Sequence, residues 1–306
     1  MSEQTAPTLS QSPSITWQHR VEALGVGAFG GALRALPVDQ ASALMAPVMA
    51  TLMGRSKKTA RAFEHLQLAM PERADEHAAI VAGMWHHLGR VTAEAFHIDR
   101  LLDDQDRLDV PEIYDALRPV TKDGVIMATP HLGNWEIGAA VARRAGLSVC
   151  GVYQKLHNPI VERRLKAMRM AGYPSGLFAK GPRLGPKLIA LARQGSAVGL
   201  VADLREKRGV KVDFFGQPAF ATPLPAMLAR LSARPLIAGA VVRTEGVHFR
   251  ALIEPIDVPT TADRDEDIRI ATQRLHDVFE AWIREQPSQW MWTHRKWAKS
   301  SARPMV

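Results

Sequence analysis

Thirteen consecutive residues, Gly124-Val-Ile-Met-Ala-Thr-Pro-His-Leu-Gly-Asn-Trp-Glu136, decide the fold class and carry the strongest chemical signal in the chain. They begin with a short apolar run bounded by Gly and Pro, which predicts a buried strand over 124–129. A helical pattern follows from Trp135 to Ala145. This order places His131 at the carboxyl end of a strand, and ligands bind outside that edge in open α/β sheets.

The same alternation of apolar runs and helical patterns continues along the rest of the chain. We therefore predict an α/β core over residues 106–306, built on a mixed central sheet flanked by helices. Strands are expected at 147–153, 197–202, 212–215, 235–243 and 248–256, the last two as a hairpin, and helices at 159–171, 223–232 and 263–286, with one more that contains Pro186 and ends at Gln194.

Two further segments precede this core. Residues 1–18 are polar and rich in Ser, Thr, Gln and Pro, which predicts a disordered lead-in. Residues 19–105 show dense helix signals punctuated by Pro37 and Pro71, so we expect an N-terminal helical subdomain there. Because no Pro- or Gly-rich linker divides the chain, we expect one structural domain with an N-terminal extension.

Two charge-free stretches, 23–33 and 40–54, raise the question of membrane contact. Both fall short of the ~18 apolar residues that a confident membrane-spanning helix needs. One interpretation is a pair of core helices joined at residues 36–39. The other is a helical hairpin that dips into one leaflet, which would make 19–105 a membrane-associating subdomain; its anchors would be Arg55, Lys57, Lys58 and Arg61.

The composition excludes several classes of protein. Apolar residues make up 46% of the 306 residues and charged ones 23%, which excludes a disordered chain and predicts a large core. The single cysteine, Cys150, excludes intramolecular disulfides and a cysteine-based zinc cluster. The net charge of +8 indicates an anionic partner: nucleic acid, an anionic membrane, an acidic protein or a phosphorylated substrate. Nucleic-acid binding rests on this charge alone, because no zinc-finger or helix-turn-helix signature accompanies it.

The turn after the first strand carries a candidate catalytic pair, His131 and Glu136. A carboxylate bonded to one imidazole nitrogen fixes the tautomer, and the other nitrogen can then take a proton from a hydroxyl. The spacing alone is weak evidence, because His157 and Glu162 share it. The first pair is distinguished by its Leu-Gly-Asn-Trp filling at a strand-to-helix turn, whereas Glu162 is explained as a charge at a helix N-terminus.

The block from Thr129 to Glu136 resembles the signature of the bacterial lipid A biosynthesis acyltransferases, the enzymes of late lipopolysaccharide assembly. Both Asn residues of the chain, Asn134 and Asn158, fall within segments that resemble this family. The similar segments keep the family's order over about residues 20–297, and they are Thr129–Glu136, Val152–Pro159, Asp203, Phe214–Pro223 and Met291–Trp297.

This resemblance implies a glycerol-phosphate-acyltransferase-like fold and the transfer of an acyl chain to a hydroxyl of a lipid A precursor. The donor would be acyl carrier protein or an acyl-CoA, with no cofactor and no metal ion. His131 would be the general base and Glu136 its orienting partner. The implied partners are acyl carrier protein, the glycolipid and the anionic membrane surface, at the cytoplasmic face of the inner membrane. Another glycolipid or a lyso-aminolipid stays open as the acceptor.

Six further residues are candidates for substrate binding. Asn158 could cap the helix at Pro159 in place of contacting substrate. Asp203 could orient a catalytic group or close a local network. The two arginines could lie in a solvated loop in place of a phosphate site. The candidates are Asn134, Lys155, Asn158, Asp203, Arg205 and Arg208.

Two positions depart from the family's pattern. Gln154 stands where many members have Arg, and Leu204 stands where Gln usually follows the strand-end Asp. Near the C-terminus, three tryptophans fit either a membrane-interface belt or a tail packed on the sheet, and we favour packing. These are Trp290, Trp292 and Trp297.

Overall fold

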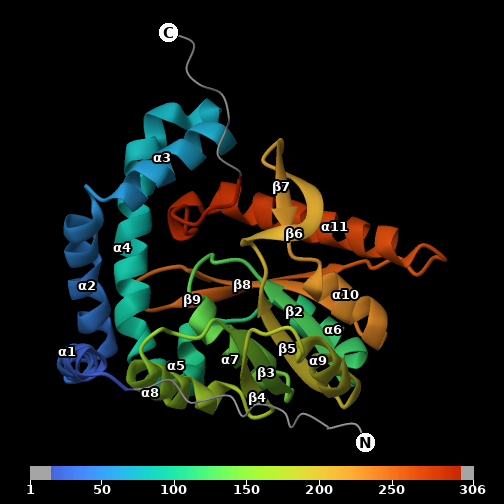
Figure 1. The fold of residues 1–306 in the computed structure, drawn as a ribbon, viewed down its shortest axis with the longest axis horizontal. Coiled ribbons are helices and arrows are strands. Elements are labelled where there is room, and N and C mark those ends of the chain that lie inside the picture. The colour runs from blue at the N-terminus through green and yellow to red at the C-terminus, as the bar shows by residue number, and fades with distance from the viewer. Residues whose placement is uncertain (1–14, 298–306) are drawn as a thin grey trace, which may run out of the picture.

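The computed structural model describes residues 15–297, and of residues 105, 113, 114 and 116 only the backbone. Within this range, seven strands form one sheet in the order β1-β9-β8-β2-β5-β3-β4 (Figure 1). Neighbouring strands are parallel except for the antiparallel pair β8–β9. The strands are β1 Leu108–Asp109, β2 Val125–Thr129, β3 Ser148–Tyr153, β4 Gly176–Ala179, β5 Ser196–Val201, β8 Leu236–Arg243 and β9 Phe249–Ile256.

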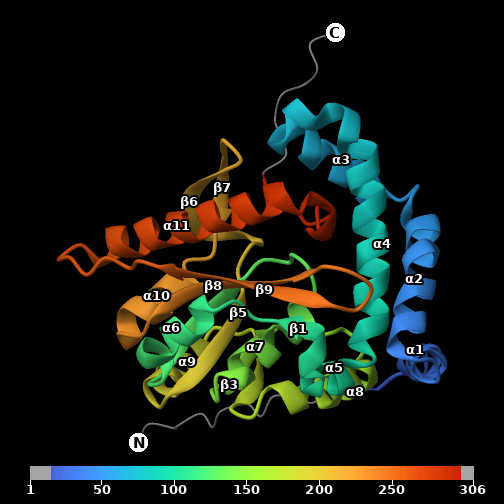
Figure 2. The same ribbon diagram turned by 180° about the vertical axis from the view of Figure 1, so that it is seen from behind.

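Helices cover both faces of the sheet, which confirms the predicted α/β class (Figures 1 and 2). Side chains alternate along β2, so that Ile126 and Ala128 belong to one apolar cluster and Val125 and Met127 contact another. The helices on the first face are α9 Leu184–Arg193, α10 Leu224–Ser232 and α11 Arg264–Glu285. Those on the second face are α5 Ile98–Asp103, α6 Ile113–Thr121, α7 Gly138–Arg144 and α8 Pro159–Arg169.

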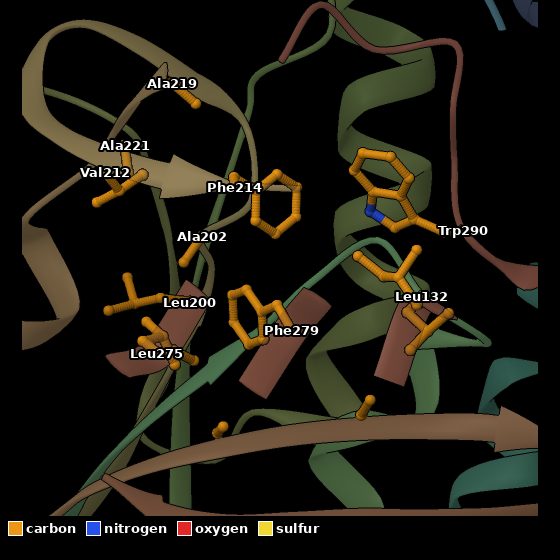
Figure 3. Packing of buried hydrophobic residues seen from close by; sticks show 14 of the residues in the cluster. Leu132, Leu200, Ala202, Val212, Phe214, Ala219, Ala221, Leu275, Phe279 and Trp290 are labelled. Carbon is orange, nitrogen blue, oxygen red and sulfur yellow. The ribbon is translucent and has the colours of Figure 1, made fainter. Parts of the chain in front are cut away.

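Aromatic side chains fill the first-face cluster. Phe214, Phe279, Trp290 and Leu132 point into one shared volume (Figure 3). Trp290 is stacked on Phe215 and lies edge-on to the buried Trp292, and large aromatic side chains of this kind contribute much of a core's apolar burial. All three tryptophans of the C-terminal segment are buried. The prediction of a packed tail is therefore confirmed.

A separate two-stranded hairpin differs from the sequence prediction. Strand β6, Arg205–Phe214, is longer than the predicted strand at 212–215, and it pairs with β7, Gln217–Ala221, which we did not predict. Phe215 and Gly216 both have positive φ, the requirement of a type I′ hairpin turn. Because β7 satisfies the backbone groups of β6, the basic segment that we expected as a loop is extended strand.

The N-terminal region is helical, with α1 Trp17–Arg34, α2 Val38–Met53, α3 Lys57–Ala69 and α4 His77–Ala95. Thr16 caps α1 by accepting from the His19 N–H, so the last two residues of the predicted lead-in, 17 and 18, are helical. Residues 1–14 of that lead-in lie outside the described residues. No helix within residues 15–297 combines the length and the apolar character needed to cross a membrane.

Helices α1 and α2 are joined by a short connection and run in different directions. Helix α2 lies beside α4, whereas α1 is seen end-on in both views and so crosses α2 (Figures 1 and 2). The inner side of α2 buries Ala41, Met45 and Ala46, and residues 35–37 separate the two helices. The inner side of α2 therefore packs on α4, while α1 packs on α8.

Candidate active site

The central pair of the site, His131 and Asp203, lies just beyond the ends of two neighbouring strands. Thr129 at the end of β2 is paired in register with Val201 at the end of β5. His131 follows its strand by two residues, and Asp203 follows its strand by two residues as well. Because the two strands are parallel and adjacent, both side chains emerge together at the carboxyl edge of the sheet.

Asp203 holds the imidazole of His131 in place. The His131 Nδ1 lies 2.7 Å from Asp203 Oδ1, and the His131 backbone N–H donates to Oδ2 at 2.8 Å. The indole N–H of Trp290 also donates to Oδ2, at 2.8 Å. The carboxylate accepts these bonds in a buried position, with a side-chain exposure of 2%. His131 is therefore oriented by a carboxylate that is itself fixed from three sides.

The charge state of Asp203 follows from the same contacts. Burial raises the pKa of its carboxyl, but the positive charge of His131 and the hydrogen bonds from His131 and Trp290 outweigh burial. The net pKa lies well below the ordinary value. Asp203 is ionised at neutral pH, so Nδ1 of His131 donates to it, and in the neutral form of the ring the lone pair is then on Nε2.

Glu136 is not the partner of His131 in this structure, which corrects our expectation. Its carboxylate binds Arg169, with distances of 2.7 Å to Nε and 2.5 Å to Nη2. The reason is local: residues 135–137 form one turn of 3₁₀ helix capped by Asn134, which accepts from the Glu136 N–H. A bidentate carboxylate–guanidinium pair is strong and geometrically specific. Glu136 therefore fixes the end of α8, while Asp203 fixes the imidazole.

The turn that presents His131 is clamped by backbone contacts. Gly133 has φ of +62°, and a Cβ there would lie 2.0 Å from the Val241 carbonyl oxygen. The neighbouring Asn134 N–H donates to that same oxygen at 2.7 Å, and His87 Nε2 lies 3.0 Å from the Gly133 carbonyl oxygen. Only glycine combines this φ with such a close approach. The glycine of the motif is thus required by the backbone.

A mostly apolar cavity of about 440 Å³ opens beside His131. It lies on the second face of the sheet, between the central strands and α7. The sheet contributes Met127, Val149 and Val201 to its lining, and α7 contributes Ala139. His131, Trp135 and Arg169 line the same space, so a polar catalytic group, an aromatic ring and a cation meet apolar walls.

Comparison with known proteins identifies the family of this chain. Residues 13–299 match the family described as bacterial lipid A biosynthesis acyltransferase. The chain belongs to this family of acyltransferases. The resemblance drawn from the motifs is therefore confirmed.

Individual relatives are also similar to this acyltransferase. The phosphatidylinositol mannoside acyltransferase of Mycolicibacterium smegmatis is 28% identical over 221 residues, which cover 68% of this chain and 69% of that protein. The enzyme of the same name from Mycobacterium tuberculosis is 27% identical over 209 residues, which cover 66% of this chain and 61% of that protein. The match thus spans between three fifths and seven tenths of these relatives' own lengths.

The two asparagines of the acyltransferase motifs have structural contacts. Asn134 is fully buried, and its side-chain amide donates to Glu94 at 2.8 Å. Asn158 caps α8 by accepting from the N–H groups of Ile160 and Val161, as its second interpretation predicted. Its amide also donates to the His19 carbonyl oxygen and to the Glu22 carboxylate of α1. Both asparagines therefore join elements of the fold.

The three basic candidates have different places in the structure. Arg205, the first residue of β6, is half-buried and lines the cavity, and its Nε is buried without a hydrogen-bond partner among the described residues. Lys155 and Arg208 are exposed, and neither is among the described residues that line the cavity. The structure thus brings Arg205 to the site together with His131.

Sequence reasoning did not assign roles to Arg169 or His294, whereas Asp203 orients a catalytic group, as its second interpretation predicted. The ring of His294 lies 4.9 Å from that of His131, centroid to centroid. Burial, followed by the nearby His131, lowers the pKa of His294 to about 4, so this second ring is neutral at pH 7. Within residues 15–297, no three His, Cys, Asp or Glu side chains gather closely enough to hold a metal ion.

Proposed function

We propose that this acyltransferase moves a fatty acyl chain from a thioester donor to a hydroxyl of a glycolipid, with His131 as the general base. The observation that supports this most strongly is the position of His131. Its Nδ1 is engaged by an ionised carboxylate, and its ring lines an apolar cavity large enough for a ligand. An acyl chain in the cavity would therefore lie beside the basic Nε2 of His131.

The reaction needs no nucleophile from the protein. Nε2 of His131 takes the proton of the acceptor hydroxyl as its oxygen attacks the thioester carbonyl carbon. The carbonyl oxygen becomes an oxyanion, and the intermediate collapses with loss of the donor thiolate. The proton on His131 passes to that sulfur. The new ester and the free thiol leave, and His131 is again neutral with its proton on Nδ1.

Arg169 is proposed to stabilise the oxyanion. It lines the cavity, and two of its nitrogens are fixed by Glu136. A fixed positive charge in a partly desolvated site stabilises developing negative charge more than a mobile one in water. Glu136 is then a positioning residue for Arg169. This role would explain why the motif has a carboxylate at residue 136.

Acyl carrier protein is the proposed donor, with coenzyme A as the alternative carrier. The chain has 39 basic and 31 acidic residues, so an acidic carrier protein is electrostatically favoured. Arg205 lines the cavity and has a buried Nε without a partner among the described residues, so we propose that it binds the phosphate of the carrier's prosthetic group. Both carriers present the same thioester.

Two acceptors compete under this proposal. Membership of the family favours a lipid A precursor, whereas the named relatives act on phosphatidylinositol mannosides. The test is incubation of the purified protein with palmitoyl or lauroyl thioesters of carrier protein or coenzyme A, and with each glycolipid. Mass spectrometry should detect one added acyl chain on at least one glycolipid. Thioester turnover with neither glycolipid acylated would contradict the proposal.

We also propose peripheral binding at the cytoplasmic face of the inner membrane. Leu44, Val48 and Leu52 recur every four residues on the outer side of α2 and are 53%, 38% and 73% exposed. Trp17, Val21 and Leu24 form a similar stripe on α1. Arg55, Lys57 and Lys58 are exposed directly after α2, where they would meet anionic headgroups.

Flotation with anionic phospholipid vesicles tests this surface. Changing Leu44 and Leu52 together to Glu should lower vesicle binding by more than about 10-fold, because burying each Leu contributes about 1.5–3 kcal/mol. Val120→Glu is the matched control, since Val120 is an exposed apolar residue of α6. Equal loss in the control, or no loss in the double variant, would contradict membrane binding through α2.

A further inference from the structure

Two central strands lack side chains where they face the cavity. Gly199 of β5 and Gly239 of β8 both line it, and both are partly exposed although their strands lie inside the sheet. Between them runs β2, whose Met127 faces the same way and is partly exposed too. Central strands of a covered sheet normally carry Val, Ile or Leu at such positions. The bare backbone forms a floor, and we call Gly199, Met127 and Gly239 the glycine floor.

The space above this floor is open. A Cβ added at Gly199 would meet only the Cys150 carbonyl oxygen, at 3.6 Å. A Cβ at Gly239 would meet the Met127 Cε at 3.9 Å and the Leu252 carbonyl oxygen at 4.0 Å, both ordinary contacts. Neither glycine is therefore required by backbone crowding, and neither has a positive φ.

A third cavity glycine provides the contrast. Gly151 of β3 is paired in register with Gly199, yet a Cβ there would lie 2.5 Å from the Tyr173 ring and 3.1 Å from Leu177. Gly151 is thus explained by protein packing, and the glycine floor is not. Voids over a sheet forfeit dispersion contacts and destabilise the fold unless something fills them.

The cavity is closed two residues further back along the strands. There Val125, Val149 and Ala197 stand side by side in register and are buried at 1%, 2% and 0% exposure. A chain that enters beside His131 therefore passes over the glycine floor before it meets this wall. Gly199 and Met127 are paired in register next to this wall, whereas Gly239 lies two residues nearer the carboxyl edge, beyond Ile237, which pairs with Met127. A long chain therefore passes Gly239 before its far end reaches Gly199 and Met127.

We propose that the glycine floor sets the length of the acyl chain that the protein accepts. This rests on the proposed function. Hydrogen at residues 199 and 239 leaves room for terminal methylenes, and the flexible Met127 thioether adjusts the remaining gap. A side chain at either glycine occupies that room directly. Each methylene that no longer fits lowers kcat/KM by about 10–200-fold, the usual discrimination of an apolar pocket.

The experiment compares kcat/KM across acyl carrier protein thioesters of increasing chain length. Gly199→Val is expected to shorten the preferred chain and to lower kcat/KM for the longest wild-type substrate by at least about 10-fold. Shorter chains should react as in the wild type. Gly239→Val should act likewise, and Met127→Ala should shift the preference toward longer chains.

Gly185→Val is the matched control. Gly185 lies in α9, outside the cavity lining, and a Cβ there meets nothing within 4 Å. Its chain-length profile should equal that of the wild type. If Gly199→Val does not fold, as judged by its thermal unfolding, Gly199→Ala and Met127→Ala provide the same comparison with smaller changes.

The outcomes separate the two proposals. A wild-type protein that transfers no acyl chain of any length overturns the proposed function. A wild-type protein that transfers long chains, with folded variants of all three floor residues keeping its length preference, overturns the glycine floor alone. A uniform loss over all chain lengths in the floor variants also overturns it, because a length determinant must spare short chains.

Discussion

Replacing His131 by Ala is expected to lower kcat/KM for acyl transfer by about 10²–10⁴-fold, the usual contribution of a positioned general base. The ring lines the cavity and its Nε2 is the basic atom of the Asp203–His131 pair. Without it, the acceptor hydroxyl must lose its proton to water. The rate of ester formation, followed by mass spectrometry at a fixed donor concentration, measures this effect.

Folding must be separated from chemistry in this variant. The side chain of His131 donates to a buried carboxylate, so its removal leaves one acceptor with an unpaired oxygen, at a cost of about 1–3 kcal/mol. His131→Asn is the matched variant, because its amide N–H can still donate to Asp203 while providing no base. Normal thermal stability with lost activity supports the assignment. Full activity in either folded variant contradicts it.

Replacing Asp203 by Asn is expected to lower the rate by a similar factor, about 10²–10⁴-fold, through the tautomer of His131. The carboxylate accepts from the His131 backbone and from Trp290 through Oδ2, and from the ring through Oδ1. An Asn that keeps its oxygen at the first two donors must present its NH₂ group to Nδ1. The imidazole proton then moves to Nε2, where it blocks the lone pair.

Glu136→Gln is the informative comparison for Asp203→Asn. It removes the charge that fixes Arg169 but leaves the Asp203–His131 bond intact. Both variants should be slow, because both positions serve the transition state. Only Asp203→Asn should alter the ionisation of the base, so only its pH–rate profile should lose the limb that belongs to the imidazole. A pH–rate profile that changes in Glu136→Gln and not in Asp203→Asn would support Glu136, and not Asp203, as the partner of His131.

Much of the fold could be predicted because its signals are local. The strand before His131, the hairpin near the end of the core and the long final helix are marked by runs of apolar residues and by Gly or Pro at their ends. The N-terminal helices follow from the density of helix formers. The first part of β6, residues 205–211, could not be predicted, because its basic and polar residues form a strand only when β7 pairs with them.

In the candidate site, too, residues with local sequence signals could be predicted and residues brought together by the fold could not. His131 could be found because its surroundings in sequence are distinctive, and Glu136 was assigned to it because it is near in sequence. The partner that binds the ring is Asp203, 72 positions away, brought there by the pairing of β2 with β5. A register argument could have found it, since both residues follow a buried strand by two positions. Arg169 gave no comparable signal, because helix α8 brings it to Glu136 only in the folded chain.

The ¹⁵N NMR spectrum of the His131 imidazole shows which ring nitrogen carries the proton, and with it which carboxylate orients the base. With ¹⁵N-labelled histidine, the His131 signals are identified by their loss in His131→Ala and recorded at a pH at which the ring is neutral. We expect a protonated Nδ1 and an unprotonated Nε2 in the wild type and in Glu136→Gln, and the reverse in Asp203→Asn. A wild-type ring with its proton on Nε2, or a tautomer that responds to Glu136→Gln and not to Asp203→Asn, would contradict it.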